Sequence, residues 1–112
     1  MGESIPKRTF SYEEAAALLP EVRRITEEAY LLASSVATPG MLESLTPEVE
    51  GRLGEILSEW AQAVMATGAE VKGLWLVDFD NGSGYYCWHY PEKGLHYYHS
   101  YEEGFRGRMR IH

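Results

Sequence analysis

Apolar and small residues in the first half of the chain recur in alternating steps of four and three. They fall at Leu18, Val22, Ile25, Ala29, Leu32 and Val36, and again at Val49, Leu53, Ile56, Trp60, Ala63 and Thr67. This spacing lines up one stripe on an α-helix, which is typical of helices that pack on one another. Two matched stripes joined by a short connection predict an antiparallel helical hairpin over residues 11–67.

Capping and breaking residues set the expected helix ends. Ser11 and Glu14 form an S-x-x-E capping box, so the first helix is expected to begin at about Tyr12. Pro20 lacks the N–H that a helix interior needs, and it predicts a kink, or a stop and restart. Thr46-Pro47 predicts the start of the second helix.

The period changes after Val71, where strand-like runs alternate with turn sequences. The expected strands are residues 74–79, 84–90 and 95–99, separated by an Asp80-Asn81-Gly82 turn and by a turn over residues 91–94. The result is an α+β fold: the helical hairpin, its first helix kinked at Pro20, then a three-stranded antiparallel β-meander over residues 74–99 and a structured tail over residues 100–112.

Alternation along the strands divides the side chains between two faces. If Tyr90 faces Leu95, then Trp88 faces Tyr97 and Tyr86 faces His99. Trp75, Val77 and Phe79 would share that apolar face and lie on the helices. The opposite face would carry Leu74, Leu76, Asp78, Tyr85, Cys87, His89, His96 and Tyr98. A slip of one residue would exchange the two sets.

That opposite face is too aromatic for ordinary surface and too polar for a core, so it favours contact with a ligand or with another copy of the protein. Self-association would also enlarge a small core. Two hairpins that meet as a four-helix bundle are the simplest arrangement. We therefore expect a homodimer.

Composition narrows the class of protein. The 112 residues are 45% hydrophobic and 24% charged, which fits one globular domain over residues 1–112. The net charge is −7, and the first 60 residues hold eleven acidic and five basic side chains. An acidic surface repels phosphate backbones, which argues against nucleic-acid binding.

Neither a membrane nor a secretory role is indicated. No apolar run approaches the roughly 20 residues of a membrane span. The N-terminus lacks the apolar segment of a secretory signal, and the single cysteine, Cys87, cannot form an internal disulfide. We therefore expect a cytoplasmic location.

Residues 97–108 combine aromatic rings, a histidine, two carboxylates, two glycines and two arginines. A turn could bring His99, Glu103 and Arg108 together as a pocket for a small anion, with bidentate contacts from Arg108. The competing interpretation is a purely structural tail, in which Phe105 plugs the core, Glu103 pairs with Arg108, and His99 bonds to backbone.

A metal site is the second possibility. In the expected register His89 faces His96, with Cys87 two residues along the strand, and imidazole and thiolate ligands suit a divalent metal such as zinc. The candidate ligands are His89, His96 and His99. The C-x-x-C and H-E-x-x-H spacings are missing. A nucleophilic role for Cys87 has even less support than the metal site, because its side chain and that of His89 project in parallel and do not converge. We therefore expect a buried, unreactive thiol.

Several motifs resemble those of domain-of-unknown-function family 2203, a family of small bacterial proteins. The opening motif F-x-x-E-E-A-x-x-L-L-P is matched by residues 10–20, L-V-D-F by residues 76–79, a C-W pair by Cys87-Trp88, and the closing E-G-F-x-G-R by residues 103–108. The resemblance supports one fold along nearly the whole chain. It implies no chemistry, since the family has no established activity.

These observations lead to one expected function and one alternative. We expect a small cytoplasmic, homodimeric binding or interaction module, without catalysis of its own and without a cofactor, that binds a small anionic ligand near His99 and Arg108. The alternative is a metal-binding protein or metal-dependent hydrolase that uses the histidines of the meander.

Overall fold

The computed structural model describes residues 8–38 and 45–111. An α+β fold is confirmed, with two helices followed by a sheet. In chain order the elements are α1 (Tyr12–Val36), α2 (Pro47–Met65), β1 (Glu70–Gly73), β2 (Leu76–Asp80), β3 (Gly84–His89), β4 (Tyr97–Ser100), a 3₁₀ helix (Phe105–Gly107) and β5 (Met109–Arg110). In this part of the chain, neither helix has the length and apolar character needed to cross a bilayer.

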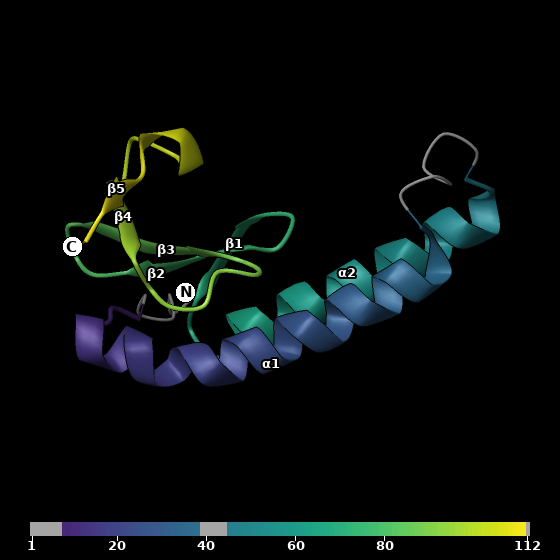
Figure 1. The fold of residues 1–112 in the computed structure, drawn as a ribbon, viewed down its shortest axis with the longest axis horizontal. Coiled ribbons are helices and arrows are strands. Elements are labelled where there is room, and N and C mark those ends of the chain that lie inside the picture. The colour runs from purple at the N-terminus through teal and green to yellow at the C-terminus, as the bar shows by residue number, and fades with distance from the viewer. Residues whose placement is uncertain (1–7, 39–44, 112) are drawn as a thin grey trace, which may run out of the picture.

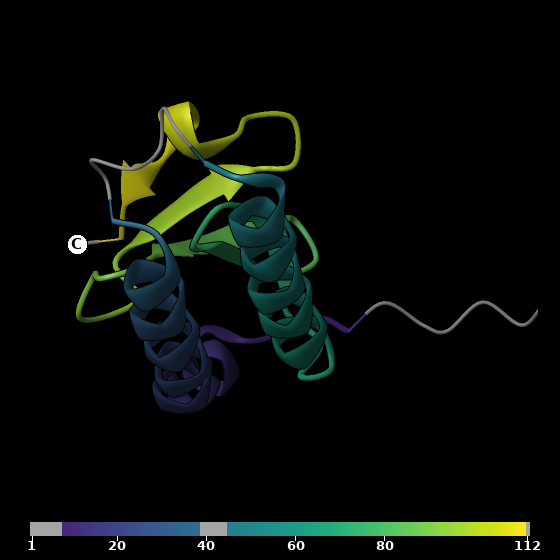
Figure 2. The same cartoon turned by 90° about the vertical axis from the view of Figure 1, so that its right-hand side faces the viewer.

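The elements form three layers. The two antiparallel helices lie on one face of the sheet, and the C-terminal tail lies on the other (Figures 1 and 2). The far half of the hairpin continues beyond the edge of the sheet (Figure 1). The radius of gyration is 15.4 Å, against about 13 Å for a compact domain of this length. The projecting hairpin accounts for the difference.

Helix α1 begins where the capping box predicts. The Ser11 side chain accepts a hydrogen bond from the Glu14 N–H, and the Glu14 side chain accepts one from the Ser11 N–H. Pro20 lies inside the helix, exposed to solvent. An interior proline costs about 3 kcal/mol, whereas burying a large apolar side chain contributes about 1.5–3 kcal/mol, and Leu19 and Val22 are both buried. The prediction of a kink, or of a stop and restart, is therefore corrected to one continuous helix.

The core lies between the helices and the sheet, and it departs from the predicted stripes at several positions, Leu32 and Thr26 among them. Val22, Ile56 and Trp60 are buried as predicted, but Leu32 is 49% exposed. Thr26, which the pattern missed, is fully buried. Its hydroxyl accepts a hydrogen bond from Trp60 Nε1 (2.9 Å) and donates one to the Val22 carbonyl (2.8 Å). The polar groups at the centre of the hairpin therefore satisfy one another.

The sheet has five strands in the order β1-β2-β3-β4-β5, all antiparallel, so the prediction of three strands is wrong. Leu74 and Trp75, expected in a strand, form the turn between β1 and β2. Trp75 has φ 60°, which costs a non-glycine residue roughly 1–2 kcal/mol. Ring contacts with Trp60 (5.0 Å) and Tyr30 (5.7 Å) hold it there. The hydrophobic pattern cannot distinguish a tryptophan in a left-handed turn from one in a strand.

The two predicted registers have different outcomes. The Asp80-Asn81-Gly82 turn is confirmed, and Val77 lies opposite Trp88 as the face assignment requires. Between β3 and β4 the register is wrong by one residue, because Tyr85 lies opposite His99 and Cys87 opposite Tyr97.

The connection between β3 and β4 explains this slip. Residues 90–96 form a longer loop than the expected four-residue turn, since the Glu92 side chain accepts a hydrogen bond from the His89 N–H and the Glu92 carbonyl accepts one from Trp88 Nε1. His99 and Tyr97 consequently share a face with Cys87, and Tyr98 shares the other face with Tyr86.

The Thr26–Trp60 contact makes a testable prediction. Thr26→Val keeps the shape of the side chain but removes the acceptor of Trp60 Nε1, so we expect the free energy of unfolding to fall by about 1–3 kcal/mol, measured by urea denaturation. Thr26→Ser keeps the hydroxyl and loses one methyl group, which should cost about 1 kcal/mol or less. A serine variant less stable than the valine variant would contradict this account.

Candidate functional site

The face of the sheet opposite the helices, called here the second face, is buried beneath the tail. Asp78, Tyr85, Cys87 and His99 are each no more than 6% exposed. Three ring contacts attach the tail to this face: Tyr101 on Tyr85 (5.1 Å), Phe105 on His89 (5.4 Å) and the guanidinium of Arg108 on Tyr97 (4.0 Å). The aromatic residues of this face are therefore covered by the chain's own tail.

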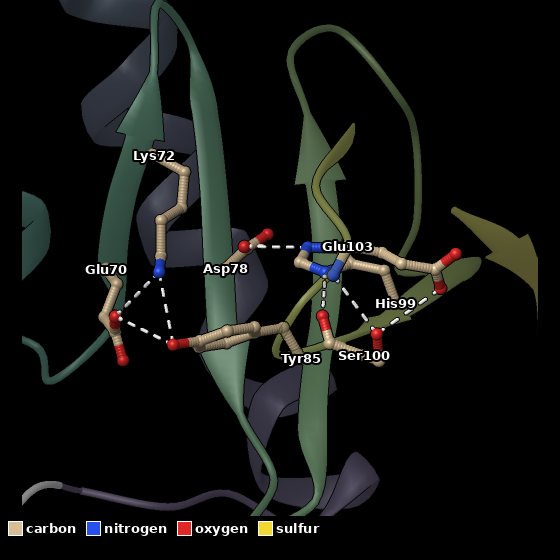
Figure 3. A network of polar contacts seen from close by, with 7 residues as sticks. All are labelled: Glu70, Lys72, Asp78, Tyr85, His99, Ser100 and Glu103. Atoms are coloured by element: carbon tan, nitrogen blue, oxygen red, sulfur yellow. Dashed lines mark hydrogen bonds and ion pairs between the residues drawn. The ribbon is translucent and has the colours of Figure 1, made fainter. Parts of the chain in front are cut away.

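A histidine–carboxylate contact lies at the centre of the second face (Figure 3). His99 Nε2 is 2.8 Å from Asp78 Oδ2, and His99 Nδ1 is 2.7 Å from the Ser100 carbonyl oxygen. A carbonyl oxygen can only accept, so Nδ1 carries a proton and donates it. The short contact between Nε2 and Oδ2 then holds a further proton, shared between the imidazole and the carboxyl group. The ring is fixed at both nitrogens.

Burial controls the acidity of the two groups beside His99. Burial raises the pKa of the Asp78 carboxyl above its ordinary value, and this outweighs the opposing effects of His99 and of the Cys87 thiol. Burial, together with the neighbouring Asp78 carboxyl group, raises the pKa of the Cys87 thiol to about 12, although Arg108 acts in the other direction. Both groups are therefore held toward their neutral forms.

The sheet register brings these three side chains together. Asp78 and Cys87 are direct partners on β2 and β3, and His99 lies on β4 two residues beyond Tyr97, the β4 partner of Cys87. One ligand atom from each residue lies within 4.8 Å of the others. Among the described residues, these three side chains lie close enough together to hold one metal ion. We call it the Asp78–Cys87–His99 cluster.

Polar side chains continue outward on both sides of the cluster (Figure 3). Lys72 on β1 contacts Glu70 (3.2 Å) and donates to the Tyr85 hydroxyl (3.2 Å). On the other side, Ser100 bonds to Glu103. A cavity of about 370 Å³ lies between these groups and is lined by Asp78 and His99, among others. The cluster thus borders an opening under the tail.

The three residues predicted to bind an anion are not gathered into one pocket. His99 and Glu103 line the cavity, and Ser100 connects them. Arg108 is not among the described residues that line it. Its guanidinium contacts both Glu92 carboxylate oxygens (2.8 and 3.0 Å) and lies over the Phe105 ring. Arg108 therefore pairs with a side chain of the protein, and both contacts are made by one guanidinium nitrogen, Nη1.

The purely structural interpretation of the tail also predicted contacts that differ from those in the structure. Phe105 is 42% exposed and packs on His89 and Arg108, so it does not plug the core. Arg108 pairs with Glu92 instead of Glu103. His99 does bond to backbone, at Ser100. The tail is held down, but by contacts that sequence spacing could not identify.

The structure separates the three histidines predicted as metal ligands. His89 lies four residues along β3 from Tyr85, the partner of His99, which is about 13 Å at strand spacing. His96 lies in the β3–β4 connection, exposed. Sequence reasoning missed Asp78 as a neighbour of His99 because this pairing depends on the β4 register.

Comparison with known proteins gives one match. A family model described as "Uncharacterized conserved protein (DUF2203)" matches residues 8–111. Neither a curated protein nor a solved structure matches the chain.

The raised pKa of Cys87 predicts low reactivity. At pH 8 a thiol with a pKa of about 12 is thiolate in a fraction on the order of 10⁻⁴. Alkylation by iodoacetamide should therefore be roughly a thousandfold slower in the native protein than in guanidinium-unfolded protein, where the thiol has its ordinary pKa. Native and unfolded rates within tenfold of each other, measured by mass spectrometry, would contradict the assignment.

The Arg108 contacts predict a structural effect. Arg108→Lys loses the planar guanidinium that lies over the rings of Tyr97 and Phe105, so the free energy of unfolding should fall by about 1–2 kcal/mol. Arg106→Lys, at an exposed position of the same tail, is the control and should change stability by less than about 0.5 kcal/mol. An unchanged melting temperature in Arg108→Lys would instead favour the anion-binding role.

Proposed function

Because the chain belongs to the DUF2203 family, whose description names no activity, we propose its function from its own surfaces. It is a small homodimeric binding module without catalysis of its own, and the dimer forms through the projecting half of the helical hairpin. The observation that supports this is an apolar groove between that half and the β1–β2 turn.

The groove has the composition of an interface centre. Its volume is about 220 Å³, and none of the described residues that line it is charged. The lining comes from both helices and the turn, and includes Tyr30, Leu53, Leu57 and Leu74. Tyr30 and Leu74 are 39% and 59% exposed. Depletion of charge with exposed aromatic and aliphatic side chains is characteristic of the buried centre of protein interfaces.

A second copy is the occupant that fits this groove. The hairpin extends past the sheet (Figure 1), so its outer half has one helical neighbour and no sheet to cover it. A two-fold dimer uses the same patch twice, and this patch offers both projecting side chains and a hollow. Two hairpins joined there form a four-helix bundle, in which all four helices pack around one core.

Charge does not prevent this association. Each copy carries −7, but at physiological ionic strength charges more than about 8 Å apart are largely screened. The groove itself adds no repulsion, since its lining is uncharged. The free energy of association at this surface therefore depends mainly on apolar contact.

The remaining parts of the proposal concern ligand and location. A small anionic ligand would have to displace Glu92 from Arg108, and this role stays a prediction. The cytoplasmic location is supported by Cys87, a free thiol, which is typical of reducing compartments. The bacterial origin rests on the resemblance of the opening and closing motifs.

Two leucines of matched exposure test the dimer. Leu74 lies in the groove and is 59% exposed, while Leu31 lies outside it on α1 and is 60% exposed. We expect Leu74→Gln to weaken dimerisation roughly 10- to 100-fold, since both copies lose apolar contact, and Leu31→Gln to leave it unchanged. Native mass spectrometry and light scattering across a dilution series measure both. A monomeric wild-type protein would contradict the proposal.

A further inference from the structure

We propose that the Asp78–Cys87–His99 cluster is a zinc site, in which the Asp78 carboxylate, the Cys87 thiolate and His99 Nε2 are the three protein ligands. This goes beyond the binding-module proposal, which concerns the hairpin. It also differs from the histidine trio predicted from the sequence, of which only His99 takes part.

The donor set suits zinc. Zinc binds sulfur, imidazole nitrogen and carboxylate oxygen, whereas calcium and magnesium prefer oxygen ligands alone. The three side chains come from adjacent strands, β2, β3 and β4. Their ligand atoms all lie within 4.8 Å of one another. The backbone of the sheet therefore holds them together before any ion binds.

His99 is oriented as a metal-binding histidine. Such residues donate their second ring nitrogen to a carbonyl or carboxylate, which fixes the tautomer and directs the other nitrogen at the ion. His99 Nδ1 donates to the Ser100 carbonyl, and Nε2 points at Asp78. In the protein without metal, a proton between Nε2 and Oδ2 takes the place of the cation.

An independent sign of a ligand is a buried oxygen without a partner. Asp78 is 1% exposed, and its Oδ1 accepts no hydrogen bond from any described residue. The Cys87 thiol is close enough to the Asp78 carboxyl group to lower its pKa by hydrogen bonding, but Oδ1 itself has no hydrogen-bond partner among the described residues. An unsatisfied buried oxygen costs about 1–3 kcal/mol, and more when the group is charged. A cation at the cluster would satisfy it.

The charges of the cluster balance. A divalent ion with one thiolate and one carboxylate forms a neutral set, which removes the cost of burying each charge alone. Arg108 lies near Cys87, but Glu92 neutralises it through their ion pair. The second face can therefore hold the ion without an uncompensated charge.

The movement required is small. Tetrahedral zinc keeps its nitrogen, oxygen and sulfur ligand atoms about 3.3–3.7 Å apart. The contact between His99 and Asp78 (2.8 Å) must then open by about half an ångström, and the widest separation in the cluster must close by about one ångström at most. Side-chain rotation supplies shifts of this size without moving the strands.

The cavity beside the cluster provides access and a fourth position. Asp78 and His99 both line it, and Glu102 and Glu103 at its rim favour the approach of a cation, against one base, Lys72. Three protein ligands leave one position of a tetrahedral zinc ion for a water or another small ligand. The tail that covers the second face thus also forms the entrance to the site.

The test uses the full-length untagged protein, stripped of metal and then given one equivalent of zinc or cobalt. Native mass spectrometry should show one ion bound, and the cobalt form should show thiolate-to-cobalt charge-transfer absorption in the near ultraviolet. Cys87→Ala should abolish that absorption and weaken zinc binding roughly 100-fold or more, and His99→Gln should weaken binding similarly. His89→Gln and His96→Gln are matched controls and should bind as wild type does.

Each other outcome overturns the proposal. A wild-type protein that binds no zinc at micromolar concentration has no site here. Binding that survives Cys87→Ala, or that is lost in His89→Gln or His96→Gln, places the ion elsewhere. Because Cys87→Ala removes a small side chain while leaving the His99–Asp78 contact in place, far-ultraviolet circular dichroism should confirm that this variant still folds.

Discussion

The contact between the Asp78 carboxylate and the His99 imidazole is the interaction on which the second face depends. Both groups are almost fully buried and lie 2.8 Å apart. A buried charge or polar group of this kind is tolerated only when it is paired. The contact links β2 to β4 across the intervening strand β3, and Ser100 extends it to the tail through Glu103. The central strands and the tail are therefore coupled through one polar pair.

The tail determines which surface is left for partners. Tyr101, Phe105 and Arg108 lie on aromatic rings of the second face, so this face is an interior layer. The apolar groove remains on the hairpin, where the helices extend beyond the sheet (Figure 1). The ion and the second copy that we propose would therefore occupy separate places on the protein.

The helices and the face assignment of the first two predicted strands could be predicted from the sequence because local rules control them. The capping box at Ser11 and the alternation of Val77, Phe79 and Trp88 act over a few residues. The register of β4 could not be predicted, because Glu92 folds the preceding loop through contacts with His89 and Trp88. A shift of one residue there moves His99 from the helix side to the second face, beside Asp78. The partner of Arg108 was missed for the same reason, since Glu92 lies sixteen residues earlier in the chain.

The most direct test of this account is the state of the His99 ring, observed by long-range proton–nitrogen nuclear magnetic resonance on the metal-free protein. The account predicts a protonated Nδ1 whose hydrogen exchanges slowly with water, because it is buried and donated to the Ser100 carbonyl. The exposed His96 serves as the internal reference and should exchange rapidly. A His99 ring that exchanges as His96 does, or that carries its proton on Nε2 with Nδ1 bare, would contradict the account.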